Sequence, residues 1–199
     1  MPFTIITPPT VLAVNPLDAM DHTVVEGTDD FDLISQYIKA FTNHGQNLTG
    51  RQFVETVFEL DLDEFPFGDI ELKPNLQSVT SVIYTDGDDV EQTLNANTYI
   101  VKTTPLVGYI TPVDEWPSDV ADPADLKVRF NAGYPLSSNK ATTPEDIKTW
   151  IMVRVAGIYE QRANFVLSKG GKFGVAPMPR DFVDSILDAY IVPGVGSGV

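Results

Sequence analysis

The spacing of apolar residues along this chain changes from helical to strand-like and back again. Between residues 31 and 48 the apolar positions recur as in one stripe of a helix; they are Phe31, Ile34, Ile38, Phe41 and Leu48. From Val54 to Leu62 the period is two, and helix signals return at Thr143. This order predicts an α+β fold, in which helices near both ends of the sequence form one core and the segments between them form a β insertion.

Cap residues predict where the helices begin and end. Asn15 followed by Pro16 opens a short helix, and Gly50 ends the helix that starts near residue 31. Gly45 is expected to weaken the last turns of that helix. Thr143 is placed to cap a long helix whose apolar positions occupy more than one face, which predicts neighbours on two sides. These positions are Ile147, Trp150, Ile151, Val153, Val155, Ile158 and Tyr159. A last helix is expected within 179–191.

Seven strands are predicted in the insertion, at 53–62, 70–73, 77–85, 90–94, 98–102, 108–112 and 126–132. Clusters of Pro, Gly, Asn and Asp separate them, as is typical of a small, mostly antiparallel sheet. Asp86 and Gly87 stand where the first hairpin must turn, and Gly87 is expected to supply the positive φ of the turn. The predicted division is an N-terminal arm with core helices at 1–52, the β insertion at 53–135, C-terminal core helices at 143–191 and a flexible tail at 192–199.

The 199 residues carry 13 basic and 28 acidic side chains, a net charge of -15. A protein that binds nucleic acid tightly needs Lys and Arg to displace counterions from phosphate, so this charge excludes such a role. The excess is uneven, since residues 1–100 have a net charge of -14 and residues 101–199 of -1. One end of the folded protein is therefore expected to be far more negative than the other.

The sequence contains no cysteine, so disulfide and thiolate chemistry are excluded. The opening "MPFTIITPPTVLAV" lacks a basic start, and Pro8 and Pro9 interrupt its apolar run, so neither a signal peptide nor a membrane span is expected. The sequence analysis predicts a soluble protein made in the cytosol, without a membrane partner.

Residues that could support catalysis or metal binding are few and scattered. Neither His22 nor His44 has a pair of further metal-ligand residues at helical spacing, so a metal site is not expected. The G-x-S-x-G motif of serine hydrolases is absent. The carboxylates of Asp61, Asp63, Glu64 and Asp69 could supply the acid/base pair of a glycosidase. No aromatic, sugar-stacking set is concentrated around them, so a solvated acidic rim is the expected interpretation. The prediction is a non-enzyme without metal or cofactor.

Five segments in order and spacing resemble the head-tail connector (adaptor, head-completion) proteins of tailed bacteriophages. They are "TGRQFVETVFELDLDEFP" (49–66), "IELKPNLQSVTSVIYTDGDDVEQTLNANTYIV" (70–101), "WP" (116–117), "KVRFNAGYP" (127–135) and "TPEDIKTWIMVRVAGIYEQR" (143–162). The resemblance covers roughly residues 49–165. It implies a structural virion protein at the neck, which forms a ring of 12 copies under the portal protein and continues the DNA channel.

The resemblance also implies partners and contact residues. The partners are other copies of the chain, the portal protein, the next connector, stopper or tail protein, and double-stranded DNA that passes without sequence-specific binding. The C-terminal arm is expected to engage the portal through Tyr190, Ile191, Val192, Pro193, Val195 and Val199. The hairpin tip is expected to contact a neighbour or a tail-side protein through Tyr84, Asp86, Gly87, Asp88 and Asp89. The long helix is expected to serve the core or the ring interface through Trp150, Ile151, Ile158, Tyr159 and Arg162.

Charge and composition are compatible with two functions, a connector that surrounds a DNA channel and a binding module. A net charge of -15 suits a channel through which DNA slides, since Lys and Arg lining it would hold the phosphates. The alternative is a non-catalytic β-rich binding module, for carbohydrate or a receptor, which would present exposed aromatic residues.

Overall fold

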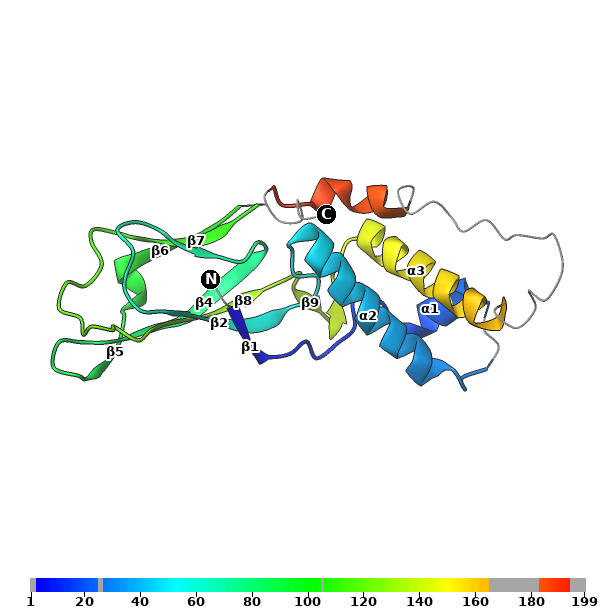
Figure 1. Cartoon of the computed structure of the whole chain (residues 1–199), viewed down its shortest axis with the longest axis horizontal. Coiled ribbons are helices and arrows are strands. Elements are labelled where there is room, and N and C mark those ends of the chain that lie inside the picture. Colours follow the sequence, from blue (N-terminus) through cyan, green and yellow to red (C-terminus); the bar gives the residue numbers. More distant parts are fainter. Residues whose placement is uncertain (1–2, 25–26, 105, 165–182, 194–199) are drawn as a thin grey trace. The chain divides into compact units, whose positions relative to one another are not determined.

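A computed structural model describes residues 3–24, 27–104, 106–164 and 183–193, with the backbone alone for 161–164 (Figure 1). The chain divides into two compact units. The β unit comprises Met1–Thr10 and Val54–Leu136, and the helical unit comprises Val11–Phe53 and Ser137–Val199. The sequence predicts that residues 1–10 form an arm of the helical core, but β1 (Phe3–Thr7) pairs antiparallel with β2 (Thr56–Leu62), which satisfies its backbone groups.

The β unit consists of two antiparallel sheets. The five-stranded sheet has the order β1-β2-β8-β4-β5, with β4 at Leu76–Thr85, β5 at Glu91–Thr93 and β8 at Leu126–Ala132. The three-stranded sheet has the order β3-β7-β6, with β3 at Ile70–Leu72, β6 at Tyr99–Thr103 and β7 at Gly108–Pro112. A short 3₁₀ turn, η1 (Ala96–Thr98), precedes β6. Every predicted strand is present.

One core cluster joins the inward faces of the two sheets. The five-stranded sheet contributes Phe58, Leu60, Val82, Leu126, Val128 and Phe130, and the three-stranded sheet contributes Ile70, Leu72, Tyr99 and Ile110. In β2 the buried residues alternate with partly exposed ones as the period of two predicts. The sequence analysis missed β1 and the small hairpin of β9 (Leu136–Ser137) and β10 (Lys140–Ala141), because these strands are short and lack a clear alternation.

The helical unit contains α1 (Pro16–His22), α2 (Phe31–Thr49), α3 (Glu145–Asn164) and the 3₁₀ helix η2 (Ser185–Tyr190). The Asn15 side chain accepts a hydrogen bond from the N–H of Leu17, and Gly50 ends α2 with φ 73°, so both predicted helix ends are confirmed. Helix α2 continues through Gly45 to its predicted end. The mixed α/β class with antiparallel sheets is confirmed.

Helix α3 packs with α1, α2 and η2, and its buried residues follow a single stripe. These residues are Ile147, Trp150, Ile151 and Val155. The sequence predicts burial on more than one face, but Val153, on the far side of α3 from this stripe, is only partly buried. Ile158 continues the buried stripe toward the end of the helix and is 41% exposed.

Candidate functional site

The residues predicted to engage the portal begin at the end of η2. At this point hydrogen bonds join the described chain to the end of α2. The N–H of Val192 donates to the carbonyl oxygen of Thr49 at 2.8 Å, and Nε of Arg51 donates to the carbonyl oxygen of Tyr190 at 2.5 Å. The Tyr190 hydroxyl donates to Asp146 at 3.2 Å. Hydrogen bonds to backbone groups hold this segment in one position in the absence of a partner.

Val192 corrects one expectation from the sequence, which assigned no packing partner to the tail from residue 191 onward. Its side chain is only 6% exposed, whereas Ile191 is partly exposed and Pro193 is exposed. Val192 is buried because the backbone bond to Thr49 draws it against the helical unit. It is therefore a structural anchor of the segment, and Val195 and Val199 lie outside the described residues.

The predicted hairpin tip is a turn organised by Asp86. The Asp86 carboxylate accepts hydrogen bonds from the N–H of Asp88 and of Val90 and from the side chain of Gln92, at 3.1, 2.9 and 2.7 Å. The bond from Val90 above all, with those from Gln92 and Asp88, lowers the pKa of Asp86 from its ordinary value of 3.8. Asp86 thus builds the turn, which leaves Gly87, Asp88 and Asp89 exposed for contacts.

The positive φ of this turn lies at a different residue from the predicted one. Asp89 adopts φ 59°, whereas Gly87 is not among the residues with positive φ. Asp tolerates the left-handed conformation better than most side chains do. A Cβ atom at Gly87 would approach only the carboxylate of Asp119, which is exposed and can turn aside, so this turn does not require glycine at position 87.

An aromatic cluster formed by Phe65, Tyr84 and Trp116 lies beside this turn. The rings of Phe65 and Trp116 stack at 5.3 Å, and Tyr84 meets Phe65 edge-on at 5.4 Å. The expectation that no aromatic set surrounds the carboxylates of residues 61–69 is wrong, because the fold brings together residues that are far apart in the sequence. The sequence contains one signal of this cluster, the segment "EFPFGD", in which two Phe residues stand among acidic ones.

Nearby, Phe67 is completely exposed, at 114% of the reference area. The loop that carries it is held on both sides, because Phe65 belongs to the cluster and the indole N–H of Trp116 donates to the carbonyl oxygen of Gly68 at 2.7 Å. A large apolar side chain is thereby presented to solvent from a fixed loop.

Trp150 and Ile151, predicted to serve the core or a ring interface, belong to the core. Both are fully buried, and the Trp150 ring packs against Phe41 and His44. Its Nε1–H donates to Asp184 at 3.0 Å, and Arg154 forms an ion pair with the same carboxylate oxygen. A ring interface cannot use these two side chains because α2 and η2 already cover them.

The remaining α3 candidates lie farther along the helix. The Tyr159 hydroxyl donates to the carboxylate of Asp30 at 2.6 Å, which ties α3 to the start of α2. Ile158 is the exposed apolar residue of the set, and the side chain of Arg162 lies outside the described residues. Of the four predicted positions whose side chains the structure describes, Ile158 is the exposed one and is thus available for a neighbour.

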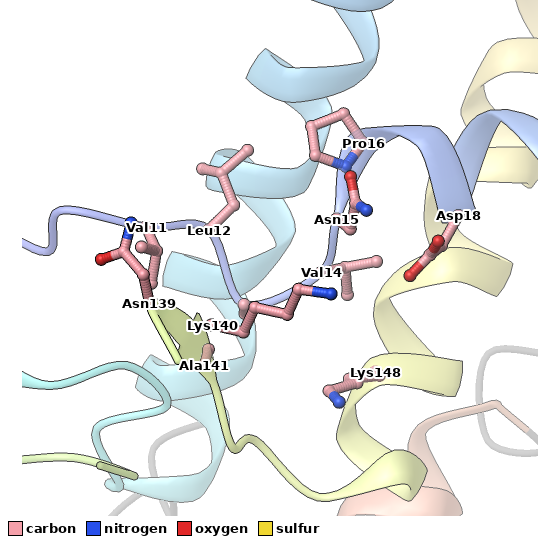
Figure 2. Close-up of a pocket in the computed structure, with 11 residues that line it drawn as sticks. Val11, Leu12, Val14, Asn15, Pro16, Asp18, Asn139, Lys140, Ala141 and Lys148 are labelled. Carbon is pink, nitrogen blue, oxygen red and sulfur yellow. The ribbon is translucent and has the colours of Figure 1, made fainter. Parts of the chain in front are cut away.

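A shallow pocket of about 260 Å³ opens beside the start of α1 (Figure 2). Val11, Val14 and Ala141 form apolar walls, and the side chains of Lys140 and Lys148 extend along it. Lys148 forms an ion pair with Glu145 at 2.8 Å. The residues that line this pocket include no hydroxyl, thiol or imidazole group, and their ionisable side chains are Asp18, Lys140 and Lys148.

Among the residues that the structure describes, Lys73 is the cationic side chain with a clearly shifted pKa. Its ammonium group lies 5.0 Å from the centre of the Phe3 ring and 5.1 Å from that of Phe58, and burial lowers its pKa. A perturbed lysine in a cleft would suggest catalysis. Lys73 instead covers the aromatic rings at the edge of the core, which indicates a role in packing.

Two features are absent from the residues that the structure describes. In those parts of the chain, no three His, Asp or Glu side chains are grouped so that they could hold a metal ion. None of the helices found there has both the length and the apolar character required to cross a membrane.

Comparison with solved structures identifies the fold. No protein-family model matches the sequence, and no curated protein sequence matches it significantly. A chain in the structure described as "Virion of native gene transfer agent (GTA) particle" has a TM-score of 0.74 at 17% identity, with 96% of each chain covered. Chains from the "Neck of empty GTA particle computed with C6 symmetry" and the "Neck of native GTA particle computed with C12 symmetry" each have a TM-score of 0.72 at 16% identity, again over 96% of both chains. Both units of this protein therefore belong to a fold that is also found in the virion and neck of gene transfer agent particles.

Proposed function

We propose that this chain is a structural protein of the neck of a phage-like particle, where it acts as a head-tail connector. The observation that carries the proposal is the similarity over 96% of both chains to components of GTA particles, including two neck structures. The five sequence segments that resemble phage connectors support it independently. The match spans the helical and β units alike, so it does not rest on one common motif.

In this proposal the chain forms a closed ring, with 12 copies under the portal protein. A ring requires two different surfaces on each subunit that meet head to tail. Exposed Ile158 on α3 is the candidate on one such surface. One of the similar neck structures was computed with C12 symmetry, which supports the copy number. The net charge of -15 suits a channel through which duplex DNA slides without being held.

The C-terminal segment is the proposed contact with the portal. Val192 and its bond to Thr49 anchor the segment, so that Ile191 and Pro193 are held at a fixed point. Truncation after Pro193 should abolish attachment to portal-bearing heads while the fold is kept. Truncation after Tyr190 should in addition destabilise the helical unit, because it removes buried Val192. Normal attachment of the chain truncated after Pro193 would refute the portal contact.

The experiment that tests the function is analysis of purified particles from cells that make this chain. Quantitative mass spectrometry should find 12 copies for each particle, and cryo-electron microscopy should place both units in a ring at the neck. Particles from cells that lack the chain should have heads without attached tails. Absence of the chain from mature particles with complete tails would overturn the proposal.

A second function is favoured by the aromatic cluster, since aromatic residues beside carboxylates are also typical of carbohydrate-binding β modules. This alternative predicts a monomer that is not incorporated in a ring and that binds polysaccharide through exposed Phe67. A glycan array with the wild-type chain and the Phe67→Ala variant distinguishes the two functions, because the connector should give no Phe67-dependent signal.

A further inference from the structure

We propose that Phe67, together with the aromatic cluster of Phe65, Tyr84 and Trp116, forms a docking surface for a Lys- and Arg-rich segment of another protein in the particle. This inference rests on the proposed neck function and goes beyond it, because it assigns a contact surface and the chemistry of the partner. Phe67 is its apolar anchor.

Three segments of the β unit converge at this surface. They are residues 63–69, residues 84–91 and residues 114–125. The first meets the second through the ring contact of Phe65 with Tyr84, and it meets the third through the stack of Phe65 on Trp116. The N–H of Ala121 donates to the carbonyl oxygen of Thr85 at 3.0 Å, which joins the second and third segments.

The charge of these segments determines which partner fits. Together they carry 12 of the 28 acidic residues of the chain and none of its 13 basic residues. Asp114 and Glu115, which directly precede Trp116, are exposed, as are Asp63, Glu64 and Asp69 around the Phe65–Phe67 loop. A surface of one sign attracts partners of opposite charge and repels others. DNA is therefore excluded as the occupant, and a cationic protein segment is favoured.

The aromatic geometry favours a protein over a sugar. One face of the Trp116 ring is covered by Phe65, and its indole N–H is already used by Gly68, so the indole offers little for a sugar to stack on or bond to. Phe67, in contrast, is completely exposed, and the contacts of Phe65 and Gly68 hold its loop in place. A fixed, exposed aromatic side chain surrounded by charge is typical of an anchor that inserts into a pocket of a protein partner.

Photo-crosslinking in assembled particles tests this inference. Phe67 is replaced by p-benzoylphenylalanine, and the same substitution at Phe31, an exposed Phe of the helical unit, is the matched control. Irradiation should join position 67, but not position 31, to a peptide of another particle protein that has a net positive charge. Mass spectrometry identifies that peptide.

Charge reversal then tests the electrostatic part. Asp114→Lys with Glu115→Lys should lower the crosslink yield from position 67 by about tenfold or more, because like charges now face each other. Asp21→Lys with Asp29→Lys, also at exposed positions, should leave the yield unchanged. Replacing Lys or Arg by Glu in the identified peptide should restore crosslinking to the Asp114→Lys, Glu115→Lys chain.

Several results would overturn the inference. They are a crosslinked peptide without net positive charge, a crosslink to a glycan or only to a second copy of this chain, no crosslink at all, or a yield that charge reversal leaves unchanged. If the chain is found in the particle but position 67 gives no crosslink, the inference alone fails. If the chain is absent from the particle, the proposed function fails as well.

Discussion

Gly45 of α2 lies so close to the ring of Phe53 that a Cβ atom at Gly45 would be 2.6 Å from Cε2 of Phe53. The same atom would be 3.1 Å from Cζ3 of Trp150. Phe53 and Trp150 are fully buried, so neither ring has free space into which it can move. The glycine that appeared from the sequence to weaken α2 is thus the position that lets these rings approach the helix.

We therefore predict that Gly45→Ala destabilises the protein even though alanine is the better helix former. The gain in helix propensity is about 1 kcal/mol, whereas overpacking a core costs about 1–3 kcal/mol. Urea unfolding monitored by circular dichroism should show a net loss of stability. Gly157→Ala in α3 is the matched control, because nothing lies within 4 Å of its added Cβ atom. It should stabilise the protein by about 1 kcal/mol, and an equal response of the two variants would contradict the packing argument.

The hairpin turn should loosen in acid. Because the pKa of Asp86 is lower in the folded protein than its ordinary value of 3.8, its hydrogen bonds stabilise the turn above that pH and are lost as the pH falls through the lowered pKa. NMR should show that the amide of Val90 loses protection from exchange over this acidic range. The Asp86→Ala variant should lack the protection at every pH, while Asp88→Ala should retain it because Asp88 contributes a backbone N–H.

The carboxylate of Asp184 should be required to hold η2 on α3. It accepts the indole N–H of Trp150 and pairs with Arg154, so Asp184→Ala leaves both groups without this acceptor. A hydrogen bond to a charged group contributes about 1.5–3 kcal/mol, and we expect a loss of stability in that range. Asp184→Asn should lose less, because the amide oxygen can still accept from Trp150. Unfolding is followed by Trp150 fluorescence in a Trp116→Phe background, since the chain has 2 Trp residues. Equal stability of the Ala variant and wild type would contradict the role assigned to Asp184.

Ile158→Asp should impair ring formation without unfolding the chain. Ile158 is 41% exposed, and changes at exposed positions usually alter stability by less than about 0.5 kcal/mol. A charge placed in an apolar interface should lower the number of copies in purified particles by about tenfold. Leu17→Asp on α1 is the control at another exposed apolar position. Full incorporation of the Ile158→Asp chain would remove Ile158 from the proposed interface.

Sequence patterns predicted those parts of the fold that depend on neighbours along the chain. The cap at Asn15 and the left-handed Gly50 determine helix ends through bonds within one turn, and both were predicted. The alternation in β2 reports which of its faces is buried, and it was also predicted. The predicted candidate residues were only partly informative, because a sequence pattern shows that Trp150 and Val192 are apolar but not what covers them.

The sequence by itself therefore determined the α+β class, the strands of the insertion, the acidic charge and the order of the elements. Only the tertiary structure decided that β1 joins the β unit, that Val192 is buried, that Gly45 admits two rings and that Phe65, Tyr84 and Trp116 form one cluster. The reason is physical. Helix caps and periodicity arise from forces between residues a few positions apart, whereas these contacts join residues far apart in the sequence, and their existence depends on how the strands pair and the helices pack.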